Sequence, residues 1–94
     1  MEIMKEQKLV YLTRRKTEVG QLKESLEQNS FELCMVIGHR LKGHGETFGF
    51  PKISSIGISM EEAAKEQNIE KLKEVVSELD KNVEENLKIV KEME

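Results

Sequence analysis

Both histidines of the chain lie in one glycine-rich segment, GHRLKGHGETFGF, which covers residues 38–50. The same segment contains four of the six glycines. Glycine in a helix interior is destabilising by roughly 0.5–1 kcal/mol relative to alanine. Something other than helix stability must therefore favour glycines here, and the nearby imidazoles suggest a nucleophile or a ligand.

Residues three and four positions apart share a helix face, so His39 shares one with Lys42 and Gly43. We expect His39 to point into solvent or to lie at the edge of the core. Lys42 would then place an ammonium beside a phosphoryl group on the ring, which carries about two negative charges. Gly43 leaves open space beside the ring, where a bulky partner could approach. Gly38 and Gly45 fall on the inner side, where small residues allow close helix packing.

A nucleophilic imidazole also needs a proton on its other ring nitrogen. A carboxylate that accepts from Nδ1–H fixes this form and leaves the lone pair of Nε2 exposed. Glu61 lies ten residues after Pro51, where a third helix is expected to begin. His39 lies seven residues before the expected end of the second helix at Glu46. Antiparallel helices would bring the two side chains to similar heights, so we expect Glu61 to orient His39.

Four amphipathic segments must position these side chains. The first helix is expected over roughly residues 8–27, and a short extra helix over residues 1–7 is an open alternative. The second begins at a cap formed by Asn29 or Ser30 and runs to about residue 46. Pro51 suits the first position of the third helix, and Asn68 is expected to cap the fourth. Short connections predict a single all-α domain over residues 1–94, an antiparallel up-down-up-down four-helix bundle.

The apolar residues at helical spacing predict the core. The inward residues are expected to be Leu12, Val19, Leu22 and Leu26 in the first helix; Phe31, Cys34, Ile37, Leu41 and Gly45 in the second; Ile53, Ile56, Gly57, Met60 and Ala64 in the third; and Leu72, Val76, Leu79, Val83, Leu87 and Val90 in the fourth. Arg14, Arg15, Lys16, Glu18 and Lys23 are expected on the outside of the first helix.

Composition excludes several classes of protein. Of the 94 residues, 37% are hydrophobic and 35% charged, with a net charge of −3, which is typical of a soluble helical domain. Lysines alternate with glutamates and form no basic stripe, so we expect no nucleic-acid partner. The longest apolar run, LCMVI, is far shorter than a membrane span of about 20 residues, and the N-terminus lacks a signal segment. We therefore expect a cytoplasmic protein without membrane contact. Cys34 is the only cysteine, so no internal disulfide forms.

The residues HRLKG at positions 39–43, with Gly49 ten residues after the histidine, resemble the signature of histidine phosphotransfer (HPt) domains. The following TFGFPKISSIG and SMEEAA are similar to stand-alone bacterial members and to the phosphoacceptor domain of chemotaxis-type histidine kinases. The likeness covers roughly residues 9–80. His44 departs from the family pattern, in which small residues are commoner at that position.

The resemblance implies roles for individual residues. His39 would accept the phosphoryl group, Lys42 would stabilise it, and Glu61 would hydrogen-bond the histidine. Gly49 would shape the turn after the second helix. The surface that docks a receiver domain is expected to comprise Gly43, Arg40, Met35 and Val36.

Proteins of this family relay a phosphoryl group from a kinase or a receiver aspartate to another receiver aspartate. The implied partners are response-regulator receiver domains and a sensor histidine kinase. No cofactor and no metal ion is expected on this chain, because the Mg²⁺ belongs to the receiver. The chain contains no GxxxxGK[ST] motif and no kinase glycine loop, so it is not expected to be an enzyme that phosphorylates itself. We expect a monomer.

Two other interpretations remain open. The chain could be the isolated phosphoacceptor domain of a chemotaxis-type kinase, which the TFGF similarity favours, or a helical adaptor that docks without phosphorylation. His44 is expected to be a surface residue that points away from His39. A metal site formed by these two histidines is not expected, because five positions separate them and the usual i, i+4 spacing is missed.

Overall fold

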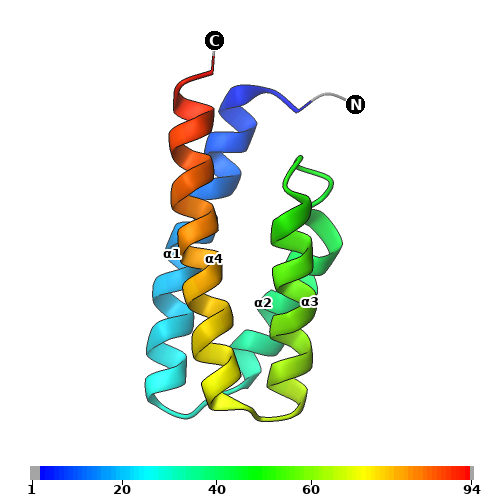
Figure 1. Cartoon of the computed structure of the whole chain (residues 1–94), viewed down its shortest axis with the longest axis vertical. Coiled ribbons are helices and arrows are strands. Elements are labelled where there is room, and N and C mark those ends of the chain that lie inside the picture. The colour runs from blue at the N-terminus through cyan, green and yellow to red at the C-terminus, as the bar shows by residue number, and fades with distance from the viewer. Residues whose placement is uncertain (1–2, 94) are drawn as a thin grey trace.

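The computed structural model describes residues 3–93, which form four α-helices and no strand. The helices are α1 (Lys5–Glu27), α2 (Glu32–His44), α3 (Pro51–Lys65) and α4 (Ile69–Lys91). Successive helices run in opposite directions, so the start of α1 and the end of α4 lie at the same end of the molecule (Figure 1). The predicted up-down-up-down four-helix bundle is confirmed. No helix within the described residues is long and apolar enough to span a membrane.

The helices pack as two antiparallel pairs, α1 with α4 and α2 with α3, and the longer pair extends beyond the shorter one (Figure 1). Apolar side chains three and four positions apart on α4 all face the core, as the sequence predicts. Fully burying one such side chain contributes about 1.5–3 kcal/mol. The buried residues of this seam are Leu72, Val76, Leu79, Val83, Leu87 and Val90, to which Val75 is added.

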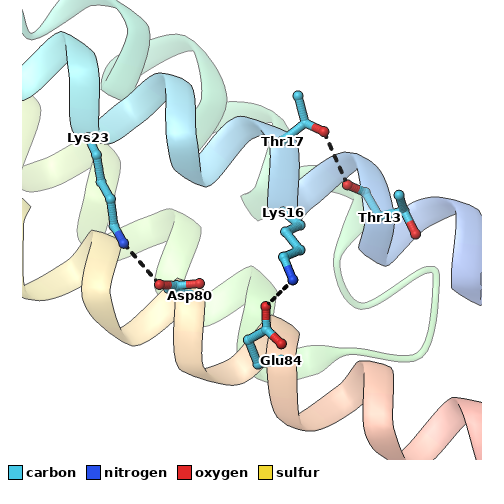
Figure 2. A network of polar contacts seen from close by, with 6 residues as sticks. All are labelled: Thr13, Lys16, Thr17, Lys23, Asp80 and Glu84. Carbon is cyan, nitrogen blue, oxygen red and sulfur yellow. Dashed lines mark hydrogen bonds and ion pairs between the residues drawn. The ribbon is translucent and has the colours of Figure 1, made fainter.

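Ion pairs across α1 and α4 supplement this apolar seam. Nζ of Lys16 lies 2.6 Å from Oε1 of Glu84, and Nζ of Lys23 lies 3.0 Å from Oδ2 of Asp80 (Figure 2). All four side chains are at least partly exposed to water, where ion pairs stabilise weakly. The seam, and not these pairs, holds α4 against α1.

The start of α2 differs from expectation. Phe31 precedes the first residue of the helix and provides no side-chain cap, so the predicted cap at Asn29 or Ser30 is wrong. Asn29 instead has φ +57°, a left-handed conformation that Asn tolerates, and its N–H donates to the carbonyl of Leu26. The N–H of Ser30 donates to the carbonyl of Ser25. Both residues therefore close α1 rather than open α2.

The other helix ends agree in part with the prediction. Asn68 caps α4 by accepting a hydrogen bond from the N–H of Lys71 at 3.1 Å. Pro51 occupies the first turn of α3, where its missing N–H leaves no bond unmade. At its C-terminal end, α2 stops at His44, two residues earlier than expected.

Residues 3–7 form no helix separate from α1. Residues 5–7 are continuous with α1, so the alternative of a short extra helix over residues 1–7 is wrong for the part that the structure describes. The N–H of Met4 donates to Oε1 of Gln7 at 3.1 Å, which satisfies one free donor at the helix start. Residues 1 and 2 lie outside the described residues.

Arg15 was expected on the outer face of α1, and this is wrong, because only 8% of the residue is exposed. Its Nε lies 2.6 Å from Oε1 of Glu18, and its guanidinium lies 4.4 Å from the centre of the Tyr11 ring. An ion pair and a cation–π contact offset the cost of burying this charge. The charged side chain is therefore buried through contacts with two other residues of α1.

Candidate functional site

Two glycines allow α2 and α3 to approach closely at the candidate site. A Cβ on Gly38 would lie 2.9 Å from the backbone nitrogen of Glu61, and one on Gly57 would lie 2.6 Å from that of Lys42. Real Cβ atoms essentially never come this close to another atom, so the two helices pack at this distance only because both residues are glycine. The predicted inward position of Gly38 is confirmed.

His39 follows Gly38 on α2, and its side chain is 69% exposed. Its Nδ1 lies 2.8 Å from Oε2 of Glu61 on α3. Within residues 3–93 no hydrogen-bond partner contacts its Nε2. One ring nitrogen is thus fixed against α3, and the other is free to meet a reactant in solution.

The carboxylate of Glu61 contacts both His39 and Lys42. Its side chain is 12% exposed, and its second oxygen, Oε1, accepts a hydrogen bond from Nζ of Lys42 at 2.9 Å. The hydrogen bonds from Lys42 and then from His39 lower the pKa of Glu61 below its ordinary value of 4.5.

The ionisation of Glu61 determines the tautomer of His39. An ionised carboxylate only accepts hydrogen bonds, so the proton between the two side chains must lie on Nδ1 of His39. A neutral imidazole with its proton on Nδ1 carries a lone pair on Nε2. The exposed nitrogen is therefore the nucleophilic one.

The surface of α2 around His39 is open and partly apolar. Met35 and Val36 lie one turn before His39, and both are exposed. Gly43 lies one turn after it, and a Cβ added there would meet no atom within 4 Å. Together with Lys42, these residues surround the imidazole with a surface that a large partner can contact.

Arg40 borders a pocket against α1, and Gly49 lies in the turn after α2. Arg40 follows His39 in sequence, but its side chain lines a pocket between α1 and α2. Gly49 has φ +90°, a conformation that residues with a Cβ rarely adopt, and its N–H donates to the carbonyl of Glu46 at 3.0 Å. The turn that connects α2 to α3 therefore depends on glycine at position 49.

Sequence reasoning missed the role of Ser54 on α3. Its Oγ accepts a hydrogen bond from the N–H of Glu46 at 2.7 Å and donates to the carbonyl of Leu41 at 3.3 Å. A Cβ on Gly45 would lie 2.6 Å from the backbone nitrogen of Ser54, so this contact also requires glycine. The signal in the sequence was a serine three residues before Gly57, on the face of α3 that meets α2.

His44 was expected at the surface, but it is half-buried against α1. Its Nδ1 lies 2.9 Å from the hydroxyl oxygen of Tyr11. Burial lowers the pKa of His44, and the charges of Arg15 and Arg40 lower it further. His44 thus contacts α1, whereas His39 contacts α3. Tyr11 lies 33 positions away along the chain, so the spacing of residues within α2 did not predict this contact of His44.

Among residues 3–93, no three side chains of His, Cys, Asp or Glu gather as a metal site would require. A family model described as the Hpt domain matches residues 10–87. The match includes all of α2 and α3, and with them His39, Lys42 and Glu61. Comparisons with curated proteins and with solved structures found no match.

Proposed function

The chain belongs to the Hpt domain family, and on that premise we propose that Nε2 of His39 carries a phosphoryl group as an intermediate of a two-component phosphorelay. One observation supports this assignment above the others. The exposed imidazole is fixed through Nδ1 by Glu61, so that the lone pair of Nε2 faces solvent.

The transfer step follows from this geometry. The lone pair of Nε2 attacks the phosphorus of an aspartyl phosphate on a receiver domain. The N–P bond forms as the bond from phosphorus to the aspartate oxygen breaks, and the aspartate leaves as a carboxylate. The ring becomes positively charged and keeps its proton on Nδ1, where the carboxylate of Glu61 stabilises it. The reverse step passes the group to another receiver.

Lys42 would neutralise charge on the transferred group. Its ammonium already lies 2.9 Å from Oε1 of Glu61, whose other oxygen contacts His39. The side chain is partly exposed and flexible enough to exchange the carboxylate for a phosphoryl oxygen. A charge-assisted contact of this kind is stronger than a neutral hydrogen bond.

The partner would dock over Met35, Val36 and Gly43. Two exposed apolar side chains and an open glycine beside the nucleophile suit a surface that excludes water around the transferred group. We propose receiver domains and a sensor histidine kinase as the partners, and the Mg²⁺ of the reaction as a ligand of the receiver. The chain would act in the cytoplasm as a monomeric phosphocarrier without autokinase activity.

The test is phosphoryl transfer from purified receiver domains labelled on their aspartates. The protein should acquire label that is labile in acid and stable in base, and His39→Gln should lose it. His44→Gln is the matched control, because it replaces the only other histidine and should keep the label. Failure of every labelled receiver to transfer, or equal labelling of His39→Gln, would overturn the proposal.

The same assay separates the two alternatives. For a phosphoacceptor domain from a chemotaxis-type kinase, which the TFGF segment favours, an ATP-binding kinase domain with ATP would label His39 directly. For an adaptor, His39→Gln would bind the receiver as tightly as the wild-type protein, and neither would acquire label.

A further inference from the structure

A pocket of about 590 Å³ lies between α1 and the end of α2. It is separate from the candidate site, because the side chain of His39 contacts α3. Its size falls within the range of small-molecule sites, roughly 300–1,000 Å³. The residues that matter for its chemistry are Tyr11, Arg14, Arg15, Arg40, His44 and Phe48.

All three arginines of the chain line this pocket, and none of its twelve lysines does. The chain as a whole has a net charge of −3, so its composition alone does not predict a cluster of positive charge here. A guanidinium is always charged, and its planar fork of donors matches a carboxylate or a phosphate better than an ammonium does. The selective use of arginine indicates an anionic ligand.

Two acidic side chains oppose these charges only in part. Glu18 pairs with Arg15 at 2.6 Å, and Glu6 lines the pocket. Arg14 and Arg40 have no acidic partner within 4 Å among residues 3–93. The pocket therefore has an excess of positive charge, which residues of α1 and α2 supply from two of its walls.

The rest of the lining consists of the rings of Tyr11, His44 and Phe48, together with Gln7 and Val10. Tyr11 stacks on Phe48 with ring centres 4.3 Å apart, and its hydroxyl meets Nδ1 of His44 at 2.9 Å. Burial, Arg15 and Arg40 all lower the pKa of His44, which favours the neutral imidazole. The pocket thus combines aromatic surface with two guanidinium groups that have no acidic partner within the described part of the chain.

We propose that this pocket binds a small aromatic molecule that carries one phosphate or carboxylate group. The anion pairs with Arg14 and Arg40, and the aromatic ring packs beside Phe48, which stacks on the buried ring of Tyr11. The site is separate from His39, and the proposal does not depend on phosphotransfer.

The test uses phenyl phosphate and benzoate as probes, titrated into the full chain and followed by NMR. Tyr11 is the only tyrosine, so its ring resonances report on the pocket directly. Saturable shifts should centre on Tyr11, Arg40 and His44, and phenol, which lacks the anion, should bind at least about tenfold more weakly. The better of the two anions identifies the preferred head group.

Arg14→Gln should weaken binding of the better probe by about tenfold or more, since it removes one of the two guanidinium groups. Lys81→Gln, an equal change of charge at an exposed site on α4, should leave the affinity unchanged. His39→Gln should also bind normally, so that failure of the phosphocarrier assay and failure of this proposal are distinguishable.

A second readout comes from His44. Glu6 and Glu18 offset the charges of Arg15 and Arg40 only in part, and a bound anion would offset them further. The pKa of His44 should therefore rise when the pocket is saturated with ligand. The proposal is overturned if neither probe gives saturable shifts at probe concentrations up to about 10 mM. A dissociation constant above that value would be weaker than most specific binding of small ligands. It is equally overturned if phenol binds as well as the anions, or if Arg14→Gln and Lys81→Gln behave alike.

Discussion

Gly38 and Gly57 meet where α2 crosses α3, and a Cβ on Gly57 would lie 2.7 Å from the carbonyl oxygen of Gly38. This backbone contact sets the geometry of the candidate site around His39. Gly38 immediately precedes His39, and Gly57 lies about one helical turn before Glu61. The 2.8 Å separation between Nδ1 of His39 and Oε2 of Glu61 therefore depends on two residues that have no side chains.

Gly57→Ala should separate α2 from α3. The new Cβ would lie 2.6 Å from the backbone nitrogen of Lys42, and backbone atoms cannot move aside as a flexible side chain can. We expect the free energy of unfolding, measured by urea denaturation, to fall by about 1–3 kcal/mol. Phosphotransfer by the folded fraction should also slow, because His39 and Glu61 move apart.

Gly20→Ala on α1 is the control for this substitution. A Cβ at Gly20 would meet no atom within 4 Å, so only helix propensity changes, and stability should rise by about 0.5–1 kcal/mol. If both alanine variants shift stability in the same direction, close packing of α2 on α3 is not what glycine at position 57 provides.

Gly43→Gln tests whether open space beside His39 matters for function. The position lies one turn after His39, and a side chain there would occupy the open space where we propose that a receiver docks. We expect a folded protein whose rate of transfer from a phosphorylated receiver is lower by about tenfold, or 1.4 kcal/mol. Gly20→Gln, an equal change on another exposed helix face, should transfer at the normal rate. Equal rates for the two variants would contradict a docking role for Gly43.

The sequence predicted the bundle and the principal contact of the site because both follow from helical periodicity. The α4 seam needs only spacings of three and four residues. The meeting of His39 and Glu61 needs, in addition, only that α2 and α3 run antiparallel from a short turn. Local rules and one topological assumption were sufficient for these features.

Contacts with α1 could not be predicted in the same way. His44 and Tyr11 are separated by 33 positions, and no spacing rule relates the end of α2 to the first turns of α1. The burial of Arg15 depends on Tyr11 and Glu18 together, so its charge alone suggested an exposed position. The start of α2 was mispredicted because Asn29 favours both helix caps and left-handed turns, and the end of α1 uses the second property.

Cys34 should be inert in the native protein. The residue is fully buried, and burial raises the pKa of its thiol from 9.0 to about 11. The thiolate that attacks disulfide reagents is therefore scarce at pH 8, and the sulfur is shielded from them. Reaction with an aromatic disulfide reagent should be slow in buffer and fast in urea. Equal rates in the two conditions would show that the thiol is accessible in the folded state.

Glu61 should titrate below its ordinary value of 4.5 when the carboxyl carbon is followed by NMR, because Lys42 and His39 donate to its ionised form. A lowered folded-state pKa stabilises the protein fully above the unfolded value of about 4.5, and this contribution is lost as pH falls through the lower folded value. Lys42→Met should raise the pKa of Glu61, since the hydrogen bond from Lys42 is the largest cause of the shift. An unchanged titration in Lys42→Met would show that the ion pair does not form in solution.

Glu61→Gln should slow phosphotransfer while leaving the fold intact. The amide keeps the size of the side chain but can donate to Nδ1, which moves the ring proton to Nε2 and removes the attacking lone pair. We expect transfer from a phosphorylated receiver to be about 10- to 100-fold slower, with nitrogen chemical shifts showing a larger population of the Nε2–H tautomer. Glu62→Gln, an adjacent change on the exposed face of α3, should transfer normally. A normal rate in Glu61→Gln together with an altered tautomer would show that orientation of the imidazole by this carboxylate does not limit the reaction.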